Sequence, residues 1–353
     1  MLQPNLLFYF YMMNENAKYR PWTAREAPKK VLFIRLQAMG DMAITLPYIQ
    51  GFKRCFPEAQ IDFVTREELD TIPNSIALFS NVYTLRGGRS TRKQAFYAVM
   101  LALKLRMTNY DVVVDLQNNK ISKIIRKLLA PASWSEFDKH SYNPAGVRTE
   151  NTIRSIGLGD ISPDFKFRLK DPSEGVALLK EVGWREGNKL VVLNPAGFTP
   201  SKNWPLDYYV EFGRLFLNEY PNTQFLALGI ERIREKVDYL QVQLGESLIN
   251  LVGKTSPATA FAVIQKVSLV LSEDSGLMHM AWVSGRATIA LYSVTISERS
   301  RPLGEHSICL SSADMECGGC MQAECMFGDV RCLTRFTPQM VLKEAIKLMK
   351  ASE

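Results

Sequence analysis

Residues 30–64 read KVLFIRLQAMGDMAITLPYIQGFKRCFPEAQIDFV, and this stretch decides the fold. A buried strand is expected over 31–34, followed by a polar loop, a helix to about residue 56 and a second strand over 61–64. Runs of four apolar or β-branched residues on either side of a helix are typical of parallel strands covered on both faces. The stretch therefore predicts a β-α-β unit.

The same alternation continues along the first half of the chain. It predicts a weaker strand near 82–85, a helix over 95–107, a strand over 112–115 and a helix over 121–129. Prolines and glycines then punctuate a polar stretch over 141–172, which is typical of a connection between domains.

After this stretch the alternation restarts. Strands are expected over 190–193, 224–228, 248–251, 269–271 and 288–291, and helices over 206–219, 233–244, 258–265, 277–283 and 339–350. We therefore expect an α/β protein with an N-terminal tail (1–28) and two Rossmann-like, doubly wound domains (29–160 and 173–353) that face a central cleft. Sheets of this class bind ligands at the carboxyl ends of their strands.

Composition limits the partners. The chain has 353 residues and a formal net charge of +7, which suits an anionic partner such as a nucleotide, a phosphorylated glycolipid or an acidic membrane face. We expect no nucleic-acid partner, because no dense basic run is interleaved with aromatic residues.

No stretch reaches the roughly 18 apolar residues of a membrane span. The apolar residues 6–13 have no cationic stretch before them and no cleavage site after them, which predicts a cytoplasmic protein. Either a locally docked tail or an interfacial anchor fits residues 6–13.

The loop after the first strand holds one glycine, Gly40, followed at once by Asp41. A dinucleotide-binding loop would need several glycines so that the backbone could approach a pyrophosphate. Two interpretations of Asp41 stay open. It could cap the following helix, or it could act as a general base that takes a proton from an attacking hydroxyl.

Two loops in the second half could meet a phosphate. Lys202 stands just before a helix that begins at a proline, and Ser275-Gly276 open another helix after a strand. Free backbone N–H groups at a helix N-terminus attract anions. Asp274 could bind sugar hydroxyls, and His279 could orient the loop.

Taken in order, three motifs point to one family. Arg-x-x-x-x-Gly-Asp (35–41), Ser-Lys-x-Trp-Pro (201–205) and Asp-Ser-Gly-x-Met-His (274–279) resemble glycosyltransferase family 9, the heptosyltransferases of lipopolysaccharide core assembly. The resemblance extends from about residue 30 to the end of the chain. It implies a GT-B fold, inversion at the anomeric carbon, an ADP-heptose donor and a lipid-linked saccharide acceptor at the cytoplasmic face of the inner membrane, with no cofactor required for catalysis.

The resemblance also implies roles for single residues. Asp41 is similar to the general base of the family, and Lys202 to its phosphate-binding lysine. The donor loop corresponds to Asp274, Ser275, Gly276 and His279, and Glu231 falls in the region that contacts the nucleoside. Arg35 and Gln117 are expected on the acceptor side. One departure is Asn118, which stands where the family usually has glycine.

Four cysteines near the end of the chain, Cys317, Cys320, Cys325 and Cys332, have the spacing C-x₂-C-x₄-C-x₆-C. Four thiolates at such spacings could hold a structural zinc, and a reduced cluster without metal is the equal alternative.

Four other functions are alternatives. A transferase of the same fold could use a different nucleotide sugar or acceptor, and a non-catalytic carbohydrate-binding protein could have kept the fold. An epimerase would need additional carboxylates. The missing glycine pattern disfavours a nicotinamide oxidoreductase.

Overall fold

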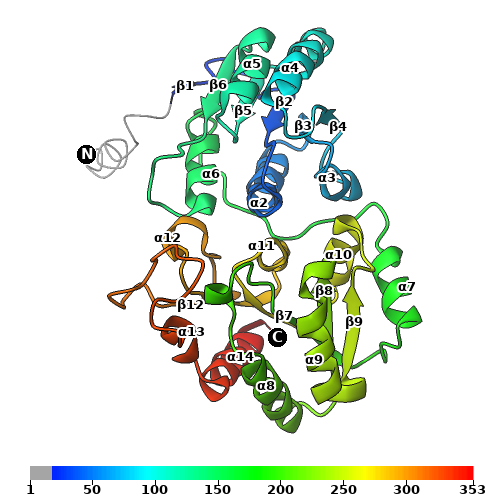
Figure 1. Cartoon of the computed structure of the whole chain (residues 1–353). Helices are drawn as coiled ribbons and strands as arrows, with labels where there is room; N and C mark the ends of the chain where they lie inside the picture. The colour runs from blue at the N-terminus through cyan, green and yellow to red at the C-terminus, as the bar shows by residue number, and fades with distance from the viewer. Residues whose placement is uncertain (1–17, 353) are drawn as a thin grey trace, which may run out of the picture. The chain divides into compact units, whose positions relative to one another are not determined.

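The computed structural model describes residues 18–352, and the chain divides after Arg168 into two compact units. Each unit is built around a six-stranded sheet, and Figure 1 labels most of the helices and strands. Unit 1 runs up to Arg168 and unit 2 begins at Leu169. The predicted tail, residues 1–28, reaches into the described part, but the apolar residues 6–13 lie outside it.

Unit 1 contains six strands. They are β1 (Tyr19–Arg20), β2 (Lys30–Ile34), β3 (Gln60–Arg66), β4 (Asn81–Leu85), β5 (Val112–Asp115) and β6 (Ser133–Glu136). The helices are α2 (Met39–Cys55), α3 (Thr71–Ser75), α4 (Thr91–Arg106), α5 (Lys120–Leu129) and α6 (Ala145–Arg154). The strand order is β1-β6-β5-β2-β3-β4, and the pairs are parallel apart from β1 with β6.

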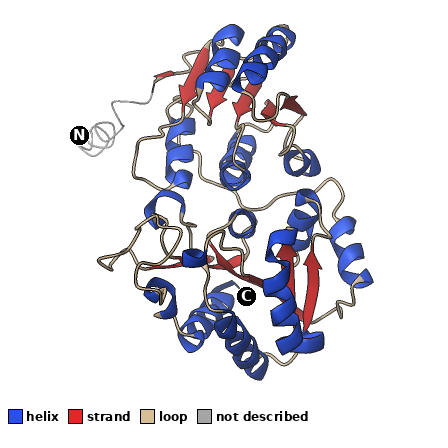
Figure 2. Ribbon diagram, in the orientation of Figure 1, coloured by secondary structure: helices blue, strands red, loops and turns tan. Residues whose placement is uncertain are grey.

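Helices cover both faces of this sheet, as Figure 2 shows. Successive side chains of a strand point to opposite faces. Leu32 and Ile34 of β2 join a buried cluster with residues of α4 and α5. Phe33, between them, packs edge-on against Phe52 of α2, with the ring centroids 5.7 Å apart. The buried strand therefore fixes a three-layer arrangement.

Unit 2 has the same architecture as unit 1, a six-stranded sheet with helices. Its strands are β7 (Lys189–Asn194), β8 (Thr223–Gly229), β9 (Leu248–Val252), β10 (Leu269–Glu273), β11 (Ala287–Tyr292) and β12 (Ser307–Ser311). Its helices are α7 (Ser173–Glu181), α8 (Leu206–Glu219), α9 (Arg234–Leu244), α10 (Pro257–Ile264), α11 (Gly276–Val283), α12 (Ser297–Ser300), α13 (Arg331–Thr334) and α14 (Pro338–Ser352), with 3₁₀ turns η1 (Pro200–Lys202), η2 (Glu231–Ile233) and η3 (Gly245–Ser247). The order β12-β11-β10-β7-β8-β9 is parallel throughout.

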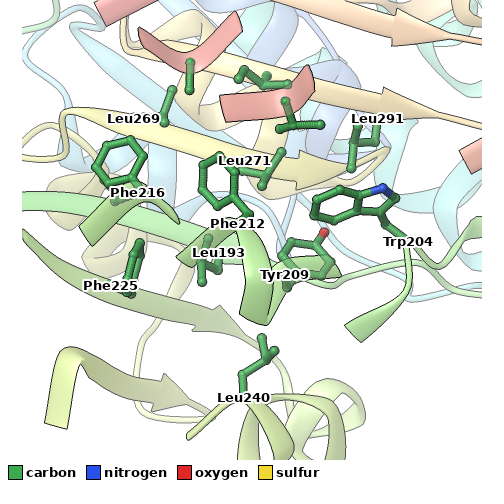
Figure 3. Close-up of a cluster of buried hydrophobic side chains, with 14 of the residues drawn as sticks. Leu193, Trp204, Tyr209, Phe212, Phe216, Phe225, Leu240, Leu269, Leu271 and Leu291 are labelled. Atoms are coloured by element: carbon green, nitrogen blue, oxygen red, sulfur yellow. The ribbon is translucent and has the colours of Figure 1, made fainter. Parts of the chain in front are cut away.

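The larger core of unit 2 lies between this sheet and helices α8, α9 and α14. Figure 3 shows Phe212 and Phe216 among strand leucines, with Trp204 beside Tyr209. Trp204 is fully buried and meets Tyr209 edge-on at 4.8 Å between ring centroids. Burial of each such side chain stabilises the fold by about 1.5–3 kcal/mol. This core fixes the start of α8, just after the loop that carries Lys202.

Both sheets reverse their strand order at one point. In unit 1 the reversal falls between β2 and β5, and in unit 2 between β7 and β10. The loops that leave neighbouring strands at such a point run in opposite directions, which opens a crevice for ligands at the carboxyl ends of the strands. The loops after β2, β5, β7 and β10 are therefore where a site is expected.

The sequence did not predict some elements, notably β6, α6 and β12. It also placed residues 19–20 in the N-terminal tail, whereas they form β1, which pairs with β6. Among the helices of residues 18–352, none combines the length and the apolar character that crossing a bilayer requires.

Candidate functional site

Arg35 ties the two loops at the reversal point of unit 1. The side chain is buried, and its Nη2 lies 2.7 Å from Oδ2 of Asp41. Its Nη1 donates to the carbonyl oxygen of Leu116, which follows β5, and the guanidinium lies 5.3 Å from the ring centroid of Phe137. Burial lowers the pKa of Arg35, and the negative charge of Asp41 opposes that shift. The buried cation thus holds the Asp41 carboxylate in place.

Asp41 is not the N-cap of α2, which corrects the sequence interpretation. The cap is Ala38, and Asp41 is the third residue of the helix. The Ala38 N–H donates to Asp41 Oδ2 at 3.4 Å, the return contact that a carboxylate at this position commonly makes. Both contacts use Oδ2, and Oδ1 accepts no hydrogen bond from residues 18–352. Since 42% of the side chain is exposed, Oδ1 can meet a hydroxyl.

The Gln117 side chain holds the backbone of the loop that follows β2. Its Oε1 accepts hydrogen bonds from the N–H groups of Leu36 and Gln37, both at 2.9 Å. The Gln117 side chain, predicted on the acceptor side, therefore fixes the loop that leads to Asp41.

Asn118 takes the place of the expected glycine without loss of the turn. Its φ is +48°, in the left-handed region, which asparagine enters more readily than most other side chains. Asn118 Nδ2 donates to the carbonyl of Phe137 at 2.7 Å. The carboxylate of Asp115 accepts from the backbone N–H of Asn118 at 2.7 Å and of Gln117 at 3.1 Å. Burial raises the pKa of Asp115 to about 6, although these bonds favour its charged form.

A basic pocket of about 420 Å³ adjoins this loop in unit 1. It is lined by Gln37, Arg66, Arg89, Thr91, Gln94, Asn119, Lys120 and Ile121. Arg66 Nη1 donates to Gln37 Oε1 at 2.7 Å. The lining has three cationic side chains and no carboxylate. Arg66 is also paired with Glu68, so Arg89 and Lys120 are the cations that suit the pocket to an anionic group. Sequence reasoning missed Arg66, whose position at the end of β3 was the available signal.

Glu273 organises the corresponding loops of unit 2. It is buried at the end of β10 and accepts the N–H of Trp204 at 2.7 Å and the N–H of Gly197. Burial raises its pKa to about 7 against the opposing effect of the two backbone bonds and Lys236. A Cβ on Gly197 would lie 2.3 Å from Asn203 Oδ1 and 2.6 Å from the Lys202 carbonyl. Only glycine fits this close approach.

Lys236 completes that frame from helix α9. Its Nζ donates to Asn203 Oδ1 at 2.7 Å and to the carbonyl oxygens of Pro195 and Gly197 at 3.1 and 3.2 Å. Burial lowers its pKa. Neither Glu273 nor Lys236 was a predicted site residue, because both act through contacts between residues distant in sequence.

Four of the six predicted donor residues lie in the same loops: Lys202, Asp274, Ser275 and Gly276. Lys202 Nζ lies 3.4 Å from Asp274 Oδ2, which also accepts from the Thr295 hydroxyl at 3.0 Å. Ser275 caps α11, since its Oγ accepts from the N–H of Met278 at 3.3 Å. Asn194 Nδ2 holds that Oγ at 2.9 Å. Lys202 and Asp274, which precedes the start of α11 at Gly276, are 72 residues apart in the sequence.

Comparison with known proteins now decides the family. The sequence pattern of glycosyltransferase family 9 (heptosyltransferase) matches residues 156–331. A lipooligosaccharide heptosyltransferase 2 of Campylobacter jejuni subsp. jejuni is 25% identical over 338 residues, which cover 91% of this chain and 99% of that protein. The chain belongs to glycosyltransferase family 9.

Solved structures share the fold of this family 9 chain. A glycosyltransferase family 9 structure from Veillonella parvula superimposes with a TM-score of 0.76 at 18% identity, covering 92% of this chain and 97% of that one. The E. coli heptosyltransferase WaaC with ADP-2-deoxy-2-fluoro heptose gives 0.64 at 21% identity, covering 90% and 99%. The two Rossmann-like units are those of a GT-B glycosyltransferase.

The other two predicted donor residues of the family 9 chain, Glu231 and His279, make different contacts. Glu231 forms an exposed bidentate ion pair with Arg234, in which Nε donates to Oε2 at 2.6 Å and Nη2 donates to Oε1 at 2.7 Å. This pair lowers the pKa of Glu231. A Cβ on Gly253 would strike its Oε1 at 1.9 Å. His279 is buried in α11 and packs edge-on against Trp282, with centroids 6.3 Å apart. His279 therefore packs within α11 against another side chain of the same helix.

The cysteines near the end of the family 9 chain do not form a metal centre in the structure. Burial raises the pKa of the Cys332 thiol to about 11, and Cys317, Cys325 and Cys320 add to the shift, so the thiols lie within electrostatic range. Residues 18–352 nevertheless hold no group of three or more His, Cys, Asp or Glu side chains placed to bind a metal ion. The zinc hypothesis gains no support from this arrangement.

Metal analysis of the purified protein tests this point. We expect less than one zinc per chain and a melting temperature that a strong chelator does not change, because the thiols are not gathered around a common centre. About one equivalent of zinc, lost together with stability on chelation, would reinstate the four-thiolate site.

Proposed function

We propose that this chain transfers a heptose from ADP-heptose to a lipid-linked lipopolysaccharide core acceptor, with inversion at the anomeric carbon. The observation that carries the proposal is the exposed Asp41 carboxylate, which a buried arginine holds at the reversal point of unit 1. The curated relative is named a lipooligosaccharide heptosyltransferase, and the WaaC structure contains an ADP-heptose analogue. Both support this choice of donor and acceptor.

Unit 2 holds the donor in this proposal. Lys202 and the first backbone N–H groups of α11, at Gly276 and Leu277, would bind the diphosphate, because a cation and a helix N-terminus both favour anions. Asp274 cannot face the phosphates without repulsion, so it would accept hydrogen bonds from the sugar hydroxyls. The Thr295 hydroxyl keeps the Asp274 carboxylate oriented for this.

Unit 1 supplies the base. The acceptor hydroxyl gives its proton to Asp41 Oδ1 while its oxygen forms the new bond to the anomeric carbon. The bond from that carbon to the β-phosphate oxygen breaks, and ADP leaves with the electron pair. Lys202 and the α11 N–H groups stabilise the charge on the leaving diphosphate. This single displacement needs one base and no covalent intermediate, and it uses no cofactor.

The acceptor chemistry gives the basic pocket a purpose. The pocket is lined by Arg66, Arg89 and Lys120, whose positive charge would neutralise the phosphates of a phosphorylated saccharide.

We also propose that the chain works at the cytoplasmic face of the inner membrane, where a lipid-linked acceptor would be presented. A different nucleotide sugar is the second candidate, and calorimetry against ADP-, UDP- and GDP-sugars separates the two.

Lys202→Ala is expected to weaken ADP-heptose binding about tenfold to a hundredfold, because it removes a charge-assisted contact to the diphosphate. Isothermal calorimetry measures the change directly. The matched control is Lys266→Ala, an exposed lysine just before β10 at the opposite end of the strands, which should bind normally. Equal affinity in both variants would remove Lys202 from the donor site.

A further inference from the structure

Helix α4 of unit 1 carries an exposed apolar stripe. Phe96, Met100, Leu103 and Met107 are 63%, 53%, 52% and 89% exposed. Their spacing of four, three and four residues keeps them on one face of a helix. The opposite face, at Ala98, Ala102 and Leu105, is buried in the cluster that α4 shares with α5. Packing in unit 1 therefore accounts for one face of α4 and leaves the other without a partner among residues 18–352.

Positive charge borders this stripe. Arg92 and Arg106 project to one side of it and Lys93 and Lys104 to the other, by helical geometry, and all four are exposed. Residues 86–110 contain six Lys or Arg residues and no Asp or Glu. An apolar face bordered by cations is the pattern of a helix that lies in the plane of an anionic lipid surface.

The flanking positive charge distinguishes two possible partners of this face, a second copy of the chain and an anionic bilayer. A second copy docking through the same face would bring two cationic borders together, which repels. An anionic bilayer instead matches both the charges and the apolar stripe.

The pocket supports the same choice. Arg89, Thr91 and Gln94, at the start of α4, line the basic pocket of unit 1. The helix that bears the stripe thus also reaches the pocket proposed for the acceptor saccharide.

We propose that the exposed face of α4 is a docking surface for anionic membrane lipid. Phe96, Met100, Leu103 and Met107 enter the headgroup region, and the flanking arginines and lysines pair with lipid phosphates. The inference rests on the proposed function for its purpose only, since a lipid-linked acceptor would then be presented at the start of the same helix.

Vesicle co-sedimentation of the full chain tests the surface. We expect binding to phosphatidylglycerol-containing vesicles, weak binding to pure phosphatidylcholine, and loss of binding with added salt as headgroup charges are screened. The variant Phe96→Ser/Met100→Ser/Leu103→Ser should bind at least about tenfold more weakly. Its melting temperature should stay unchanged, because these side chains are exposed. Val242→Ser, at a 79% exposed position of α9, is the matched control.

Three outcomes would overturn the proposal. They are undiminished binding by the triple variant, equal loss in Val242→Ser, and a dimer in sedimentation velocity that only the triple variant dissolves. Calorimetry with ADP-heptose keeps the two hypotheses apart. A chain that binds vesicles but no ADP-heptose would contradict the proposed function and leave the docking surface supported. A chain that binds ADP-heptose but no vesicles would contradict the docking surface and leave the proposed function supported.

Discussion

Asp41→Asn is expected to lower turnover by roughly 10²–10⁴-fold with little change in donor affinity or fold. Asparagine keeps the size of the side chain and an oxygen that can accept from the Ala38 N–H, so the start of α2 should survive. It cannot take the proton of an attacking hydroxyl, and it gives up the ion pair with Arg35. A transfer assay at saturating ADP-heptose with a lipid-core acceptor measures the loss, and calorimetry and thermal melts measure the rest.

Asp207→Asn is the control for this result, because Asp207 also lies in the first turn of a helix, α8. If Asp41 only stabilises the start of its helix, both variants should lose up to about 1 kcal/mol of stability and keep normal turnover. A well-folded Asp41→Asn protein with normal turnover would contradict the base assignment. The proposed donor residues of unit 2 would then be the remaining support for transfer.

Glu273→Gln is expected to remove a pH dependence of stability worth up to about 3 kcal/mol. The folded-state pKa of Glu273 is about 7, above the ordinary value of 4.5, because the carboxyl group is buried. The folded protein therefore keeps a proton that the unfolded chain has released. Stability from this group is fully present below pH 4.5 and is lost as the pH rises to about 7.

Urea unfolding at several pH values between 4.5 and 8 measures this effect. Asp115 also has a raised pKa, so only the difference between wild type and Glu273→Gln isolates Glu273. Glu246→Gln, at an exposed position of unit 2, should leave the wild-type profile unchanged. Parallel profiles for wild type and Glu273→Gln would mean that Glu273 is ionised throughout, with its charge balanced by the Gly197 and Trp204 N–H groups and Lys236.

The sequence predicted the strands that are apolar runs and missed those that are not. Val112–Asp115 has three valines, and β5 was expected there. Its neighbour β6 reads Ser-Trp-Ser-Glu, which carries no apolar run, although the strand is mostly buried. The Glu136 carboxylate in β6 is paired with Arg126, so a buried polar contact replaces the hydrophobic signal. Pairing with β5 and β1, not local preference, makes this segment a strand.

Some residues of the candidate site could likewise be predicted from the sequence, and others could not. Lys202 and Asp274 could be predicted because they stand in loops that follow buried strands, and the structure brings them to 3.4 Å. Glu273 could not, since its role depends on burial beneath the loop that contains Gly197, 76 residues earlier. Asn118 looked like a departure until its left-handed backbone explained why asparagine can replace glycine.

The two-residue strand β1 has a consequence for how the sheet ends. Through Tyr19 and Arg20 it pairs with β6, and the Ser133 hydroxyl donates to the carbonyl of Arg20 at 2.8 Å. Without this cover, β6 would offer unpaired backbone groups on which another chain could add a strand, whereas a very short terminal strand gives little template for that. Removing residues 1–28 would therefore expose the backbone edge of β6 and promote aggregation.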